Sequence, residues 1–417
     1  MRISGCRSCG HKDLRMVLDL GLQPRADALL TRQHLDETEE KFPLELLFCD
    51  ACSLLQVSVT IPPDVLFRRD YPYFSSSNAA LVEHARQHVE ELVAGRGLNE
   101  NSFVVEVASN DGYLLQHLIA RGIPVLGIDP SDGPGHAAIK KGVPTLNEYF
   151  TSRLAERLAA ENKFADVIIA ANVCAHVDQI NDFIAGFKRL LKREGIAIFE
   201  FAYAIDTIEQ CEFDQIYHEH LFYHTLTGLK NLFARHGLYL HDARHLAIHG
   251  GSLRLSVTHA DHPTPRLRAM LDREHEMGAE RWPYYQNFAD RVERNVDALR
   301  SMLQDLKGKG RRIACYGAAS KGATMLNYLN LGEGFFEFVA DLSPHKQGKW
   351  MPGQNLPIVS PDKLSVDAAD FCLLLAWNFK DDILAAQASY QRAGGRFILP
   401  VPAPQIIEAD LQRAPRA

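Results

Sequence analysis

The chain has 417 residues, of which 46% are hydrophobic and 23% are charged, and this length and composition exclude both a single small domain and wholesale disorder. Because 45 basic residues stand against 52 acidic ones, for a net charge of −7, there is no overall basic field to attract nucleic acid or anionic lipid. No stretch resembles a signal peptide or a membrane span. We therefore expect a cytoplasmic monomer that binds neither nucleic acid nor membrane.

Two C-x₂-C pairs stand near the start of the chain, Cys6 with Cys9 and Cys49 with Cys52. Paired spacing of this kind is typical of a tetrahedral zinc site with four thiolates. Such a site leaves no open position for water, so its role is structural. Since the interval between the pairs is long for a zinc finger, we expect a small β-rich module.

A strand–loop–helix–strand unit begins near residue 103. A buried strand over 103–108 runs into a polar loop, and a second strand ends at Asp129, as in the first unit of a nucleotide-binding α/β fold. The loop has only Gly112 instead of a glycine-rich turn, and the strand carries an acid, Glu106. Because a pyrophosphate would be poorly held there, the pattern favours a phosphate-free nucleoside such as S-adenosylmethionine (SAM).

The next strand, over 166–170, leads to Asn172 and His176, and a helix, a glycine turn and another strand follow. This order is usual for a methyltransferase core. His176 would either line the cofactor site or only cap its element.

Four proton-handling side chains follow one another from Tyr217 to His220. In an extended segment, Tyr217 and Glu219 would share one face, with His218 and His220 on the other. Acid/base chemistry on carbon is the favoured interpretation, because a histidine near its ordinary pKa suits that work at neutral pH. A metal site with His224, or a buried polar network without chemistry, remains open.

Two later segments offer further candidate binding groups. His249 and Gly250 begin a glycine turn that feeds a strand carrying Arg254, which suits an oxyanion site or a plain hairpin. After an amphipathic helix expected over about 264–306, a second strand–turn–helix unit places Ser320 and Lys321 at a helix start, where they suit a phosphate.

The cysteine pairs and the stretches VVEVASNDGYLL, NVCAHV, FDQIYHEHLFYHT, HGGSLRL and CYGAASKGATMLNYL occur in this order along nearly the whole chain. Together they resemble the sugar C-methyltransferases that act on nucleotide-linked 4-keto-hexoses in antibiotic biosynthesis. The resemblance implies an α/β protein with a SAM-dependent Rossmann-like core and a C-terminal Rossmann-like domain for the nucleotide-sugar. The expected modules are a zinc-binding domain at 1–70, the core at 71–262, a helical connector at 263–306 and the C-terminal domain at 307–417.

The resemblance also implies roles for particular residues. His220 would be the general base that removes a proton from C3, beside the ketone of a 4-keto-6-deoxy sugar, with Glu219 and Tyr217 contacting the sugar. A tyrosine before the core, Tyr73 or Tyr71, would reach the active site. The candidate cofactor-binding residues are Glu106, Ala108, Asn110, Asp111, Gly112, Asp129, Asn172 and His176. The candidate substrate-binding residues are His249, Gly250, Arg254, Ser320 and Lys321.

Some positions depart from the resembled family. Ala202 stands where proline is usual, Cys174 where a larger aliphatic residue is common, and His224 where phenylalanine is usual. These changes leave the acceptor open to another sugar or to a non-sugar ketone. An O-methyltransferase, an oxidoreductase binding NAD(P) through the C-terminal unit, and a zinc-organised binding protein remain the alternative functions.

Overall fold

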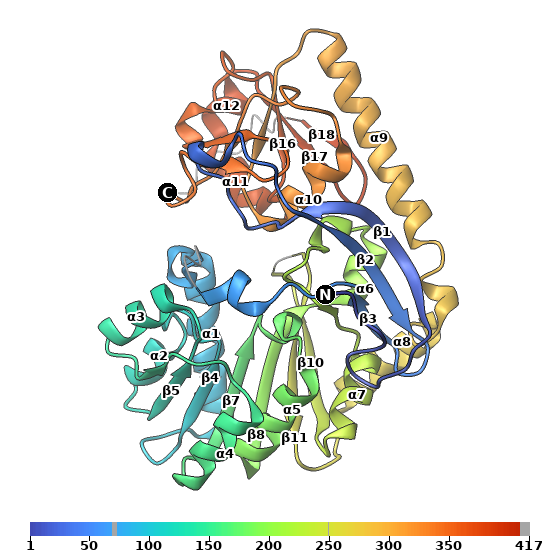
Figure 1. Cartoon of the computed structure of the whole chain (residues 1–417). Helices are drawn as coiled ribbons and strands as arrows, with labels where there is room; N and C mark the ends of the chain where they lie inside the picture. Colours follow the sequence, from blue (N-terminus) through green and yellow to red (C-terminus); the bar gives the residue numbers. More distant parts are fainter. Residues whose placement is uncertain (69–72, 249, 409–417) are drawn as a thin grey trace.

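The computed structural model describes residues 1–68, 73–248 and 250–408, and it builds three sheets from them (Figure 1). The fold class predicted from the sequence is confirmed: a small antiparallel module precedes two α/β units with mainly parallel sheets. Among the described residues, no helix is both long and apolar enough to cross a bilayer.

The first sheet is antiparallel and has the order β1-β2-β3-β9. Its strands are β1 (Leu14–Pro24), β2 (Lys41–Cys49), β3 (Leu54–Val57) and β9 (Phe222–Tyr223). Strand β9 lies directly after the histidine-rich stretch, and Tyr223 pairs with Leu55 of β3. The zinc module and the expected catalytic segment therefore share one sheet.

The second sheet has the order β10-β11-β8-β7-β4-β5-β6, with β7 at its centre and β4 beside it. Its strands are β4 (Val104–Val107), β5 (Val125–Ile128), β6 (Thr145–Leu146), β7 (Ala165–Ala171), β8 (Leu191–Ala202), β10 (Tyr239–Leu246) and β11 (Ser252–Thr258). The strands from β4 to β8 run parallel, and β10 and β11 are antiparallel additions. Because β5 and β7 lie on opposite sides of β4, the strand order reverses there, which is where such sheets bind ligands.

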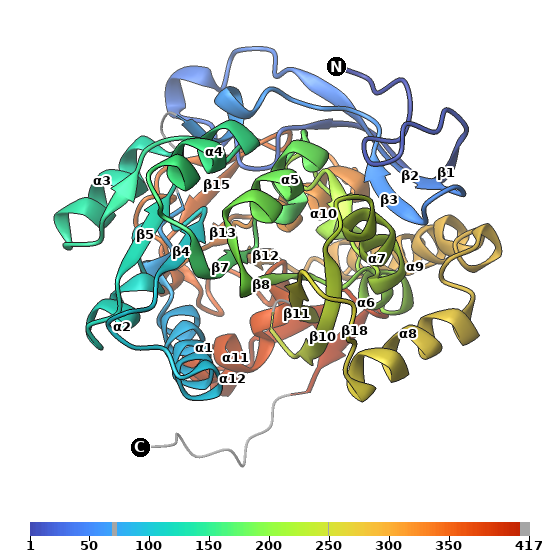
Figure 2. The ribbon, with the colours of Figure 1, turned by 90° about the horizontal axis from the view of Figure 1, so that it is seen from below.

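Helices cover both faces of this sheet. The helices are α1 (Ala79–Arg96), α2 (Leu115–Ile119), α3 (Asp132–Lys140), α4 (Ser152–Ala160), α5 (Ile180–Leu190), α6 (Ala204–Glu209) and α7 (Leu226–Arg235). In Figure 2, α4 and α5 lie on one side of β4 and β7, and α1 and α2 lie on the other. Their apolar side chains form two separate buried clusters against the strands.

The expected single connector helix is wrong, because the chain forms two helices there. Helix α8 (Pro265–Met277) ends at Gly278, whose φ of 75° lies in the left-handed region. A short turn follows before α9 (Phe288–Gly308), which packs against β1. The connector thus supports the zinc module from outside.

The third sheet has the order β14-β15-β13-β12-β16-β17-β18. Its strands are β12 (Ile313–Tyr316), β13 (Val339–Ala340), β14 (Trp350–Met351), β15 (Leu356–Val359), β16 (Phe371–Leu374), β17 (Arg396–Leu399) and β18 (Gln405–Ile407). Its helices are α10 (Ser320–Leu329), α11 (Lys380–Ala386) and α12 (Ala388–Arg392). Buried apolar side chains of β12, β16 and β17 contribute to its core.

Candidate active site

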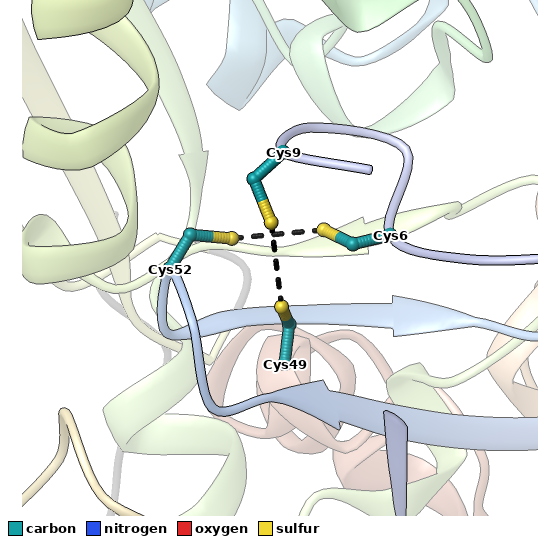
Figure 3. A group of neighbouring side chains, drawn as sticks. All are labelled: Cys6, Cys9, Cys49 and Cys52. Atoms are coloured by element: carbon teal, nitrogen blue, oxygen red, sulfur yellow. Dashed lines mark hydrogen bonds between the residues drawn. The ribbon is translucent and has the colours of Figure 1, made fainter. Parts of the chain in front are cut away.

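The four paired cysteines converge beside the first sheet, at the end of β2 (Figure 3). The Sγ atoms of Cys6 and Cys52 are 3.6 Å apart, as are those of Cys9 and Cys49. A tetrahedral zinc ion with Zn–S bonds of about 2.3 Å would separate its ligands by about 3.8 Å, so the thiols fit such an ion closely. Hydrogen bonding among the thiols lowers the pKa of Cys6 and raises that of Cys52.

The loop after β4 has a backbone conformation that side chains rarely adopt. Ala108, Asn110 and Gly112 have φ values of 56°, 50° and 77°, and Asn172 after the neighbouring β7 has 53°. Strain of this kind persists where a ligand site requires it. A Cβ at Gly112 would come within 2.7 Å of the Val143 side chain, so glycine is required there. Both loops open at the point where the strand order reverses.

Asp129 fixes the shape of the loop from the end of β5. Its carboxylate accepts the backbone N–H groups of Asn110 and Ser131, both at 2.8 Å. Asp111 instead turns toward Lys141, whose Nζ lies 2.9 Å from its Oδ2, and toward Ser76. Asp129 therefore lies at the end of β5, whereas Asp111 stabilises the loop through its contacts with Lys141 and Ser76.

Glu106 lies under this loop with 1% of its surface exposed. Neither carboxyl oxygen has a hydrogen-bond partner among the described residues, and burial raises its pKa well above the usual value. An unpartnered buried carboxyl is costly unless a ligand satisfies it. The site is therefore suited to a ligand that brings a donor or a positive charge.

The tyrosine segment before α1 crosses the cofactor loop. The side-chain amide of Asn110 donates to the carbonyl of Tyr73 at 3.1 Å, and its Oδ1 accepts the N–H of Ser75 at 2.8 Å. The Tyr73 side chain is 42% exposed. Tyr71 lies outside the described residues.

The histidine-rich stretch forms a turn, so its side chains do not alternate between two faces as they would in an extended segment. The N–H of His220 donates to the carbonyl of Tyr217 at 3.0 Å, which brings these two side chains onto the same side. The Tyr217 hydroxyl lies 2.9 Å from His220 Nε2, and the two ring centroids are 4.2 Å apart. Both residues are only partly buried, so a ligand can reach them.

His176 holds this turn to the end of β7. Its Nδ1–H donates to the carbonyl of Glu219 at 2.7 Å, and its ring centroid lies 4.8 Å from that of His220. Burial lowers the pKa of His176, which favours the neutral ring. Because Nδ1 carries the proton, Nε2 of the neutral ring is the acceptor.

The metal interpretation of the histidines finds no support in their positions. His218 Nε2 lies 3.2 Å from the carbonyl of Pro43 in the zinc module. His224 is buried between the rings of Phe201 and Phe222. In the part of the chain that the structure describes, the cysteines form the one cluster suited to a metal ion.

Glu219 points away from His220, toward the zinc module. Its side chain is buried, and its Oε1 accepts the N–H of Asp27 at 3.4 Å. Burial, and then the charge of Asp27, raise the pKa of Glu219 above its usual value. The Asp27 carboxylate in turn accepts the Ser320 hydroxyl at 2.6 Å. Sequence reasoning missed Asp27, since it belongs to no local motif.

Lys321 lies in a buried polar cluster between the core and the C-terminal domain. Its Nζ donates to Asn378 and sits 4.3 Å from the centroid of the Trp377 ring. Burial lowers its pKa to about 8, although the acids Asp214 and Glu212 oppose this shift. Lys321 already has partners and is not an open phosphate site.

Gly250 packs against the same cluster. Its φ is 93°, and a Cβ there would come within 2.6 Å of Trp377. His249 lies outside the described residues. A cleft of about 370 Å³ opens beside this turn, between the start of α1, residues 246–248 and residues 378–382.

The C-terminal sheet repeats the loop geometry of the core. Asp341, at the end of β13, accepts the N–H groups of Ala318 and Ser343 at 2.7 and 2.8 Å. Asp129 is bonded in the same way at the end of β5. The C-terminal domain thus has a second loop that is held by an aspartate at the end of the next strand, as in nucleotide-binding folds.

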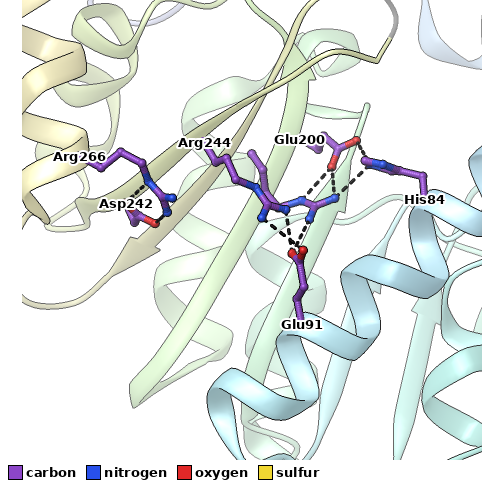
Figure 4. A network of polar contacts seen from close by, with 7 residues as sticks. His84, Glu91, Glu200, Asp242, Arg244 and Arg266 are labelled. Carbon is purple, nitrogen blue, oxygen red and sulfur yellow. Dashed lines mark hydrogen bonds and ion pairs between the residues drawn. The ribbon is translucent and has the colours of Figure 1, made fainter.

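Arg254 does not lie on the surface and does not face the other candidate substrate residues. It stands opposite Glu200 on β8, with Nε and Nη2 at 3.0 and 2.9 Å from Oε2. His84 and Glu91 of α1 complete this network, which Figure 4 shows around Glu200. Burial alone would raise the pKa of Glu200, but His84 and Arg254 outweigh it and lower that pKa to about 2.

We expect Arg254→Ala to lower the free energy of unfolding by about 3–5 kcal/mol, because it removes the permanent positive charge beside buried Glu200 and leaves His84 as the remaining partner of that carboxylate. Arg244→Ala, which removes an exposed partner of Glu91, should cost no more than about 1 kcal/mol. Since the folded pKa of Glu200 is depressed, its contribution is present above about pH 4.5 and is lost as pH falls toward 2. Urea unfolding at pH 7 and pH 3 measures both effects, and equal losses in the two variants would contradict the prediction.

Comparison with known protein families finds three matching domains. Residues 6–67 match the family described as "Putative zinc binding domain", residues 81–243 match "Methyltransferase domain", and residues 247–402 match "C-methyltransferase C-terminal domain". The chain is 34% identical over 411 residues to C-methyltransferase NovU of Streptomyces niveus, and the match covers 98% of each chain.

Two solved structures each match less than half of the chain. Magnesium protoporphyrin IX methyltransferase ChlM of Synechocystis PCC 6803, with bound SAM, is 17% identical with a TM-score of 0.32, covering 43% of this chain and 82% of that one. The PH0226 protein of Pyrococcus horikoshii OT3 is 16% identical with a TM-score of 0.36, covering 48% of this chain and 96% of that one.

Proposed function

This chain belongs to the C-methyltransferase family, and on that premise we propose that it methylates a nucleotide-linked keto-sugar. The acceptor is a nucleoside-diphosphate 4-keto-6-deoxy sugar, the donor is SAM, and the new bond forms at C3, next to the ketone. Such a reaction belongs to deoxysugar biosynthesis in the cytoplasm.

The cofactor supplies, when bound, an electrophilic methyl group on a positively charged sulfur. The residues that would hold it are Ala108, Asn110, Gly112, Asp129 and Asn172. The unpartnered carboxyl of Glu106 supports this assignment, because a cationic ligand above it would satisfy a group that is otherwise buried without a partner. Asp129 is placed to accept from ribose hydroxyls.

His220 carries the proposal. It is partly exposed, lies against Tyr217 and His176, and is held in the turn that precedes β9. A C–H bond beside a ketone is weakly acidic, so a base must take its proton while the carbonyl oxygen gains charge. His220 Nε2 takes that proton, and the Tyr217 hydroxyl, released from Nε2, donates to the enolate oxygen.

The nucleotide end of the acceptor fits the interface with the C-terminal domain. The repeated loop geometry at Asp341 supports this placement, as does the cleft beside Gly250. Ser320 lies at the start of α10, where the helix dipole favours a phosphate. Lys321, one residue further, adds positive charge behind it.

The test combines methyl transfer with hydrogen exchange. Purified protein is incubated with methyl-labelled SAM and a panel of nucleotide-linked 4-keto-6-deoxy sugars in D₂O. We expect label in a new C–C bond, together with loss of the C3 hydrogen of the acceptor. Label on oxygen with the C3 hydrogen retained would instead show an O-methyltransferase, and tight NAD(P)H binding without methyl transfer would show an oxidoreductase.

A further inference from the structure

The segment between β1 and β2 extends from the zinc module to the proposed active site. Asp27 lies there, between the histidine-rich turn of the core and the first residue of α10 in the C-terminal domain. Its backbone N–H donates to Glu219, and its carboxylate accepts from Ser320. One residue thus contacts both domains that form the proposed acceptor site.

Asp27 and Glu219 form a pair of neighbouring acidic residues, joined through the Asp27 backbone N–H, and the pair has spare hydrogen-bonding capacity. Glu219 is 4% exposed, and its Oε2 has no hydrogen-bond partner in the ranges that the structure describes. Asp27, in contrast, is only partly buried. Burial, and then the charge of Asp27, raise the pKa of Glu219 to about 8, so its carboxyl group keeps a proton near neutral pH and can donate beside the accepting carboxylate of Asp27.

We propose that Asp27, supplied by the zinc module, is a substrate-positioning residue that binds a hydroxyl group of the methyl acceptor together with Glu219. A hydroxyl both donates and accepts, so it complements a carboxylate next to a carboxylic acid. This inference rests on the proposed function, because it requires an acceptor that carries a hydroxyl near the reacting carbon.

The charge of Asp27 also acts on its neighbours. The charged and titratable groups that face the pair are Arg25, Tyr73, His176 and Tyr223. Of these, Arg25 alone brings a permanent positive charge, and it lowers the pKa of Glu219 less than burial and Asp27 raise it. Removing the charge of Asp27 should therefore lower the pKa of Glu219.

Asp27→Asn is the sharpest variant, since it keeps the size of the side chain and an oxygen that accepts from Ser320. Loss of a hydrogen bond to a charged group should raise the KM of the acceptor about 10- to 100-fold. We expect kcat to change less and the KM of SAM to stay the same. Asp36→Asn, in the same segment with an exposed carboxylate, is the matched control and should behave as wild type.

A second measurement does not depend on turnover. In protein labelled with ¹³C-glutamate, the carboxyl resonance that disappears in Glu219→Gln should titrate at lower pH in Asp27→Asn, by roughly one unit. An unchanged titration, an unchanged acceptor KM, or loss of zinc and fold in Asp27→Asn would each overturn the proposal. If wild type methylates no keto-sugar, the proposed function fails, and the titration by itself then decides whether the carboxyl pair exists.

Discussion

Replacing His220 by alanine should lower kcat by about 10²–10⁴-fold, the usual contribution of a positioned general base. The His220 ring lies beside Tyr217 and is partly exposed, whereas the other two side chains of the turn point elsewhere: His218 faces Pro43 and Glu219 faces Asp27. The loss should appear in kcat, while the affinity for SAM, measured by calorimetry, should stay the same. Exchange of the C3 hydrogen with D₂O should disappear along with turnover.

His220→Asn tests the same role with less change in volume, and it should be as slow as the alanine variant because an amide is not a base at neutral pH. His218→Gln is the control, since that side chain belongs to the same turn but contacts the carbonyl of Pro43. We expect its turnover within about threefold of wild type. Near-normal turnover in both His220 variants would exclude histidine as the base.

Removing the zinc ligands should unfold the first sheet. Cys49 ends β2 and Cys52 precedes β3, so the thiols hold the turn between these strands, and structural zinc contributes on the order of 10 kcal/mol to small domains. In Cys49→Ser we expect loss of bound zinc and rapid proteolysis within residues 6–67. Because β9 and Asp27 lose their support, kcat/KM should fall by about 10²-fold or more.

Cys211→Ala provides the matched control, as Cys211 is a buried thiol outside the cluster. It should keep its zinc, its resistance to protease and most of its activity. Metal analysis and limited proteolysis of both variants decide the question. A Cys49→Ser protein that keeps wild-type kcat/KM without zinc would show that the module does not support the active site.

The modules and many elements could be predicted from local patterns. Strand, polar loop and helix follow one another within about 25 residues around Asp129, and the same order recurs around Asp341. The prediction of one continuous connector helix was wrong, because Gly278 adopts the left-handed conformation that ends a helix. Residues 217–220 are not extended, because they form a turn that brings Tyr217 and His220 together.

By itself, the sequence determined the cysteine cluster suited to zinc, the two strand–loop–helix units and the residue types of the histidine-rich stretch, because these depend on spacing within a few residues. Only the tertiary structure decided which side chains meet. Arg254 pairs with Glu200, 54 positions away, and Asp27 reaches Glu219 across 192 positions. Contacts of this kind depend on how separate strands and helices pack, and no local pattern contains that information.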